Sequence, residues 1–90
     1  MFKNLEDLVK LIRKRKLSPK EGSYTNNLLK DKKLSVEKIK EEVSELIEAV
    51  DKDTNKIHEA ADVLYHVLVY LEANGVKIED VMSELEKRKK

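Results

Sequence analysis

One segment, from Ile57 to Leu71, restricts the possible folds of this chain more than any other. Its sequence, IHEAADVLYHVLVYL, holds only two formally charged residues, Glu59 and Asp62, although charged residues make up 41% of the chain. A helix with apolar residues on nearly every side must be buried all round. The few other helices that 90 residues allow cannot easily surround it. The segment therefore predicts that a second copy of the chain covers part of it.

The rest of the composition favours helices. Two glycines and one proline leave few turn residues for a sheet protein, and apolar residues recur at spacings of three and four. We predict a single all-α domain over residues 1–90, a small bundle of four to five helices completed by homodimerisation. The expected helices begin near Phe2, Ser23, Ser35, Ile57 and Ile78, with Ser23 or Thr25 and then Ser35 as N-terminal caps.

Two short acidic patterns carry the functional signal: Glu41-Glu42-Val43-Ser44-Glu45 and Glu59-Ala60-Ala61-Asp62. Each places carboxylates three residues apart, so each pair lies on one side of a helix. The polar connection over residues 51–56 is short enough to make the two helices antiparallel neighbours, and the pairs can then face each other. All-oxygen ligation suits Mg²⁺ or Mn²⁺ and disfavours Zn²⁺. The sequence therefore indicates a hard-cation site, with the ligands Glu42, Glu45, Glu59 and Asp62.

Helix geometry separates the three glutamates of the first pattern. Lys38, Glu42 and Glu45 share one strip of the helix, whereas Glu41 falls further round, towards solvent. Two alternatives stay open from the residues alone. Lysine or arginine from another helix could neutralise the second carboxylate pair, and acidic residues such as the first pair are common on helix surfaces.

The two histidines have different expected places. His66 lies one turn after Asp62, so it is either a further ligand or a buried histidine held by hydrogen bonds, and the second is the commoner situation. His58 faces elsewhere on the same helix, and we expect it at the surface.

Charge is unevenly distributed along the chain. Residues 1–40 hold twelve Lys and Arg against five Asp and Glu, a net charge of +7, and residues 41–90 hold seven against thirteen, a net charge of −6. A basic half can attract nucleic acid, which makes a non-enzymatic helical interaction module one alternative. The chain has no cysteine for a thiolate site, and it lacks the apolar stretch of a signal peptide or a membrane span. We expect a cytoplasmic protein with neither a membrane nor a nucleic acid as its partner.

Together with their neighbours, the acidic patterns resemble the signature of the all-α nucleotide pyrophosphohydrolase (MazG-like) superfamily. Within it, the chain is most similar to the phosphoribosyl-ATP pyrophosphohydrolase family, over about residues 5–88. The similarity rests on Arg15-Lys16, Ser23-Tyr24-Thr25, Leu28, Lys38, the EExxE pattern, His58-Glu59-Ala60-Ala61-Asp62, Tyr65-His66-Val67-Leu68-Val69, Gly75 and Glu84-Leu85-Glu86-Lys87-Arg88.

This resemblance implies a reaction on a small nucleotide, in which phosphoribosyl-ATP and water give phosphoribosyl-AMP and pyrophosphate. It also implies that the four predicted ligands hold Mg²⁺. Lys38, Arg15 and Tyr24 would bind the substrate, and Glu41 would accept a proton from the attacking water. An alternative with the same chemistry is a housecleaning pyrophosphohydrolase that acts on non-standard or surplus nucleoside triphosphates.

Overall fold

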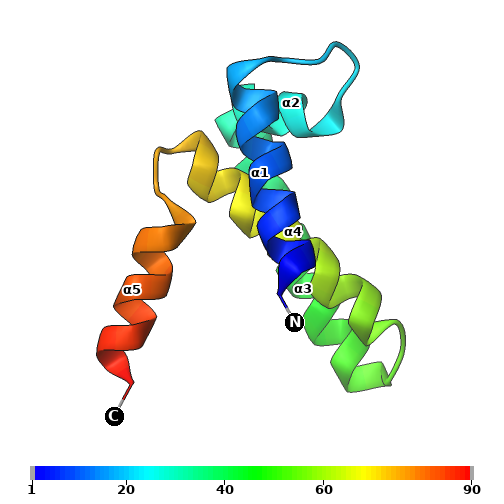
Figure 1. Cartoon of the computed structure of the whole chain (residues 1–90). Coiled ribbons are helices and arrows are strands. Elements are labelled where there is room, and N and C mark those ends of the chain that lie inside the picture. The colour runs from blue at the N-terminus through cyan, green and yellow to red at the C-terminus, as the bar shows by residue number, and fades with distance from the viewer. Residues whose placement is uncertain (1, 90) are drawn as a thin grey trace.

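The computed structural model describes residues 2–89, which form helices and connecting loops without any strand. The prediction of an all-α fold is confirmed. No helix in this part of the chain combines the length and the apolar character needed to cross a membrane. The helices are α1 (Lys3–Leu17), α2 (Tyr24–Lys30), α3 (Lys32–Lys52), α4 (Lys56–Ala73) and α5 (Ile78–Arg88) (Figure 1).

The antiparallel hairpin of α3 and α4 is the framework of the molecule, and these two helices share its most extensive packing (Figure 1). Its turn contains two residues in the left-handed conformation, Asp53 with a φ of 56° and Asn55 with a φ of 42°. Asp and Asn adopt this conformation more readily than other residues with a side chain. The Asp53 backbone N–H donates to the carbonyls of Ala49 and Val50, which closes α3. The turn places the end of α3 beside the start of α4.

Two polar residues cap the helices that lead into the hairpin. The Ser23 hydroxyl, one of the two predicted caps for this helix, accepts the Asn26 backbone N–H in the first turn of α2. The predicted cap at Ser35 is wrong. The helix starts earlier because the Asp31 carboxylate accepts the Leu34 N–H at 3.0 Å, and Asp caps a helix as well as Ser does. Ser35 lies inside α3 and is fully buried.

A small apolar core forms where α1, α2 and α4 meet. It covers only the C-terminal half of α4, so the two halves of that helix have different surroundings. The buried core residues are Val9, Ile12, Leu28, Leu68 and Val69.

The half of the hairpin nearest its turn extends beyond α1 and α2 (Figure 1) and exposes apolar side chains. Ile47 and Val50 of α3 are 65% and 58% exposed, and Ile57 and Leu64 of α4 are 88% and 57% exposed. Within one chain, therefore, α4 is not buried on every side. Its cover by a second copy stays a prediction.

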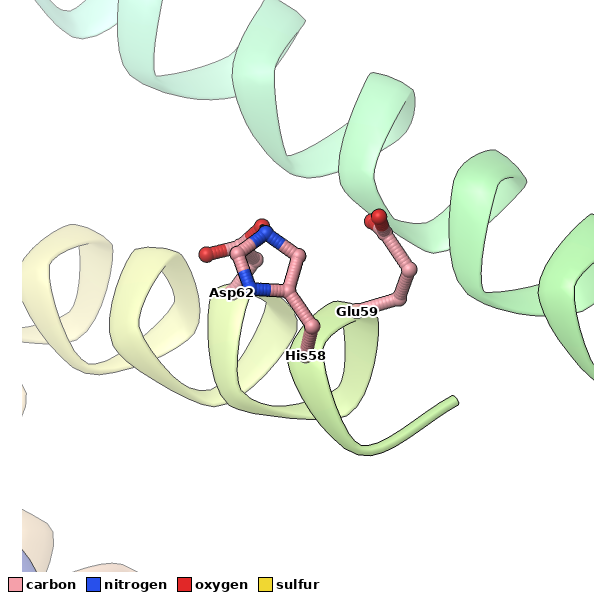
Figure 2. A group of neighbouring side chains, drawn as sticks. All are labelled: His58, Glu59 and Asp62. Carbon is pink, nitrogen blue, oxygen red and sulfur yellow. The ribbon is translucent and has the colours of Figure 1, made fainter. Parts of the chain in front are cut away.

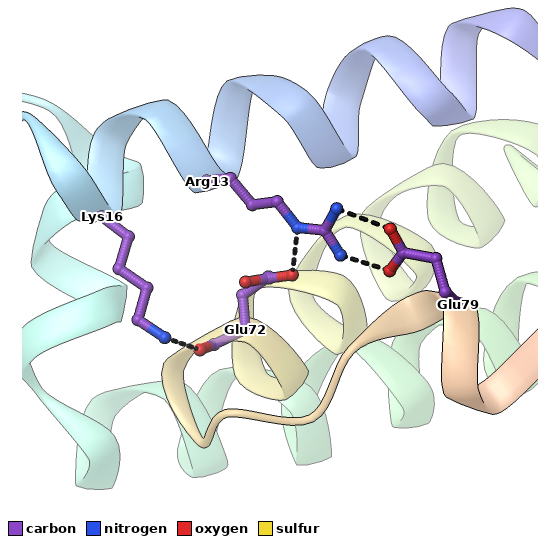
Figure 3. Close-up of polar contacts among 4 residues, drawn as sticks. All are labelled: Arg13, Lys16, Glu72 and Glu79. Carbon is purple, nitrogen blue, oxygen red and sulfur yellow. Dashed lines mark hydrogen bonds and ion pairs between the residues drawn. The ribbon is translucent and has the colours of Figure 1, made fainter.

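Helix α5 projects away from the hairpin (Figure 1) and is anchored near its start by an ion network (Figure 3). The Arg13 guanidinium of α1 donates to the Glu72 carboxylate of α4 at 2.7 Å and to the Glu79 carboxylate of α5 at 2.8 and 2.5 Å. Lys16 Nζ donates to the Glu72 backbone carbonyl at 2.7 Å. These bonds to Arg13 hold the pKa of Glu79 at about 2. The network ties the ends of α1, α4 and α5 together.

Candidate metal centre

Carboxylates from the two hairpin helices meet between them. Glu42 and Glu45 lie one turn apart on α3, opposite Glu59 of α4. One carboxylate oxygen from each lies within 4.8 Å of the other two. The structure therefore brings three of the four predicted ligands into one group.

The fourth predicted ligand, Asp62, joins a second group that overlaps the first (Figure 2). Its Oδ2 lies 3.3 Å from Nε2 of His58, and Glu59 belongs to both groups. The His58 side chain is 73% exposed, so the predicted surface position is confirmed, although its imidazole also reaches the site. The four carboxylates form one continuous acidic site between α3 and α4.

Two carboxylate oxygens of this site are buried without a hydrogen-bond partner in residues 2–89: Oε2 of Glu42 and Oε2 of Glu59. Burial raises the pKa of both groups, and the neighbouring Glu45 carboxylate raises them further. Like charges this close repel each other, and a buried carboxylate without a donor costs free energy. A hard divalent cation would supply the missing partner, so these residues fit Mg²⁺.

A hydrogen-bonded aromatic cluster adjoins the carboxylates. His66 is 5% exposed, its Nδ1 lies 2.7 Å from the Asp62 backbone carbonyl, and its Nε2 lies 3.0 Å from Tyr24 Oη. Next to it, Tyr65 Oη lies 2.5 Å from Thr25 Oγ1. The Tyr24 and Tyr65 rings stack with their centroids 6.3 Å apart. These contacts attach the start of α2 to α4 beside the acidic site.

His66 is thus a buried histidine with protein partners on both ring nitrogens, the commoner of the two situations considered for it. The contacts of Tyr24 with His66 and of Thr25 with Tyr65 were not predicted from the sequence. A signal was present, because these two short segments carry much of the family resemblance and three of the chain's few aromatic or imidazole groups. The spacing between them, however, indicates nothing about contact.

Lys38 and Glu41 lie at the exposed rim of the site. Lys38 Nζ donates to Glu41 Oε2 at 3.3 Å, and this bond raises the pKa of Lys38. Glu41 lies outside both carboxylate groups, in line with its angle on the helix. Burial raises the pKa of Tyr24, while the nearby charge of Lys38 opposes that shift. Arg15 is half-buried in α1, and its backbone carbonyl accepts a hydrogen bond from the Asn26 amide at 2.8 Å.

This all-α hairpin, with carboxylates from both helices and a lysine at the rim, is the arrangement expected from the resemblance to the all-α nucleotide pyrophosphohydrolases. Comparison with known families shows to which family the chain belongs. The family model described as phosphoribosyl-ATP pyrophosphohydrolase matches residues 5–89. The chain belongs to this family, and the resemblance seen in its sequence is confirmed.

The chain is also similar to curated proteins, two of them named phosphoribosyl-ATP pyrophosphatase and a third a larger bifunctional protein. The phosphoribosyl-ATP pyrophosphatase of Lactiplantibacillus plantarum is 42% identical over 90 residues, which cover 97% of this chain and 85% of that protein. The phosphoribosyl-ATP pyrophosphatase of Clostridium acetobutylicum is 47% identical over 93% of this chain and 79% of its own length. The histidine biosynthesis bifunctional protein HisIE of Pyrococcus furiosus is 41% identical over 96% of this chain, but only 41% of that larger protein is matched.

Proposed function

We propose that this chain is a cytoplasmic, Mg²⁺-dependent enzyme that hydrolyses phosphoribosyl-ATP between its α and β phosphates. The products are phosphoribosyl-AMP and pyrophosphate, in the second step of histidine biosynthesis. The observation that carries the proposal is the pair of buried oxygens without a partner, on Glu42 and Glu59, in a site lined by carboxylates from two helices. Membership of the family supports the choice of substrate.

In this proposal the metal ligands are Glu42, Glu45, Glu59 and Asp62. When bound, Mg²⁺ would neutralise charge on the phosphates and on the departing pyrophosphate. Mn²⁺ suits the same oxygen ligands.

The rim residues would act on the substrate itself. The Lys38 ammonium would pair with a phosphate oxygen. Glu41 would accept a proton from water as the water oxygen bonds to phosphorus and the bridging P–O bond breaks. Tyr24, which is 45% exposed, would present its ring to the nucleotide while its hydroxyl holds His66. Arg15 would contribute a further positive charge from α1.

We also propose that two copies of the chain assemble into a homodimer. The support is the exposed apolar surface near the hairpin turn, where Ile47, Val50, Ile57 and Leu64 are each more than half exposed. Burying such side chains is worth roughly 1.5–3 kcal/mol each. A second copy is the simplest cover for a helix that is apolar nearly all round.

The test is pyrophosphate release from phosphoribosyl-ATP, measured with Mg²⁺, with excess chelator, and against a panel of ordinary nucleoside triphosphates. We expect turnover of phosphoribosyl-ATP that requires Mg²⁺ and exceeds turnover of every other nucleotide. A clear preference for an ordinary or oxidised triphosphate would instead identify a housecleaning enzyme. If no nucleotide released pyrophosphate, the non-enzymatic interaction module would be the remaining hypothesis.

A further inference from the structure

A basic pocket lies at the loop between α1 and α2. Its lining does not include the acidic site between α3 and α4. Its volume is about 490 Å³, and its lining includes Lys16, Lys20 and Lys30 with one carboxylate, Glu21. Lys16 Nζ already donates a hydrogen bond to a backbone carbonyl of α4. Lys20 and Lys30 form no ion pair within residues 2–89. The pocket therefore has two ammonium groups available to an anion.

The wall of this pocket is held in shape by the protein itself. The Asn26 side chain accepts the Lys20 backbone N–H at 2.9 Å and donates to the Arg15 carbonyl at 2.8 Å. Gly22 adopts a φ of +79°, and outside Gly22 and its two chain neighbours no atom lies within 4 Å of the position that a Cβ would take there. A second amide side chain, Asn27, also lines the pocket. A ligand would therefore enter a loop that is already ordered, so it would not have to order the loop on binding.

The pocket is connected to the acidic site through Tyr24. This residue follows Gly22 by two positions in the sequence, and its hydroxyl lies 3.0 Å from His66. His66 in turn bonds the backbone of Asp62. One segment thus leads from the loop that lines the basic pocket to Tyr24, whose hydroxyl contacts the histidine bonded to Asp62.

The proposed substrate has charge at both ends, because phosphoribosyl-ATP carries a triphosphate at one end and a sugar phosphate at the other. In the proposed reaction the acidic site with its bound cation would hold the triphosphate, where the bond to be cleaved lies, so the sugar phosphate would have to bind elsewhere. We infer that the pocket lined by Lys20 and Lys30 binds the phosphate monoester of the added ribose, which rests on the proposed function. Ammonium groups form charge-assisted bonds with phosphate oxygens, and the Asn27 amide can donate to the same group. Lys20 and Lys30 are then specificity-determining residues, since ATP lacks this second phosphate.

The test compares two variants with the same loss of charge. In Lys20→Ala/Lys30→Ala the pocket loses both ammonium groups, whereas Lys32→Ala/Lys33→Ala removes two exposed lysines of α3 that do not line it. Measured near physiological salt, the first variant should raise the KM for phosphoribosyl-ATP by about tenfold or more, with kcat little changed. The inhibition constant of ATP should stay the same. The control variant should leave all three quantities near the wild-type values.

A second measurement tests the pocket without turnover. Titration of the wild-type protein with ribose 5-phosphate should shift the amide NMR signals of Lys20, Gly22 and Asn26, and the Lys20→Ala/Lys30→Ala variant should lose these shifts. Equal KM changes in both lysine pairs, a matching change in ATP inhibition, or an unchanged KM would overturn the inference. If the wild-type chain does not turn over phosphoribosyl-ATP, the proposed function fails, and the ribose 5-phosphate titration still decides whether the pocket takes a sugar phosphate.

Discussion

The Tyr24 hydroxyl and the His66 imidazole lie 3.0 Å apart, and the other contact of that imidazole determines which of the two donates. His66 Nδ1 lies 2.7 Å from the Asp62 carbonyl oxygen, which can only accept, so Nδ1 carries a proton. In the neutral imidazole Nε2 is then the acceptor, and Tyr24 donates to it. A single histidine thus links α2 to the backbone of Asp62, a predicted metal ligand.

Tyr24→Phe should lower the free energy of unfolding by about 1 kcal/mol, because it leaves Nε2 of the buried His66 without a donor. The stacked ring is retained, so the change reports mainly the hydrogen bond. Tyr70→Phe is the matched control, since the Tyr70 hydroxyl has no hydrogen-bond partner in residues 2–89. Urea unfolding of both variants is the measurement. Equal losses in the two would show that the hydroxyl of Tyr24 has no special role.

Asp62→Asn should reduce Mg²⁺-dependent pyrophosphate release by about a hundredfold or more, since it removes a proposed ligand. The fold should survive, because His66 bonds the backbone carbonyl of residue 62 and the side-chain pair with His58 is largely exposed. Asp51→Asn alters an exposed carboxylate elsewhere on the hairpin and should keep full activity. Circular dichroism checks folding in both, and unchanged release in Asp62→Asn would exclude Asp62 as an essential ligand.

Mg²⁺ should raise the melting temperature more at about pH 7.5 than at about pH 5. The pKa values of Glu42 and Glu59 are raised in the folded chain above the ordinary value of 4.5. Folding therefore takes up protons at these groups, and the metal-free protein gains stability as the pH falls from above the raised values towards 4.5. At high pH the carboxylates of the acidic site repel one another fully, and bound Mg²⁺ relieves this repulsion. Thermal scans at matched ionic strength measure the shift, and an equal shift at both pH values would contradict the assignment.

Glu79→Gln should destabilise the protein at neutral pH, and the difference from wild type should disappear in acid. Bonding to Arg13 lowers the pKa of Glu79 from 4.5 to about 2. Its contribution is therefore complete above about pH 4.5 and is lost as the pH falls towards 2. The effect should be small, because the Glu79 side chain is 62% exposed. Urea unfolding across this range is the measurement, and Glu86→Gln on the same helix is a control without an ion pair in residues 2–89.

Leu64→Glu should convert the proposed dimer into a monomer. Leu64 is 57% exposed in the single chain, and a dimer that covers this face would have to bury an unpaired charge. Ser44→Glu adds the same charge at an exposed polar position of α3 and should leave the mass unchanged. Light scattering after size exclusion gives the mass directly. A wild-type chain that is monomeric at micromolar concentration would refute the dimer.

Sequence alone determined the features that depend on helix geometry. The period of a helix places Glu42 and Glu45 on one strip and turns Glu41 away, and both results hold in the structure. A short polar connection was enough to predict the antiparallel hairpin, because the chain between the helices can reach no further. Apolar residues on nearly all sides of α4 also predicted cover by a second copy, which stays a prediction because the single chain leaves Ile57 and Leu64 exposed. Each of these features depends only on the path of the local backbone.

Tertiary structure alone decided which side chains meet. Arg13 pairs with Glu79, 66 residues away, and Tyr24 meets His66 across 42 residues. The start of α3 also differs from the prediction, because Asp31 caps the helix and Ser35 lies buried inside it. Contacts at such separations depend on how whole helices cross and rotate against one another. Many weak apolar contacts together determine that arrangement, and no single spacing in the sequence predicts it.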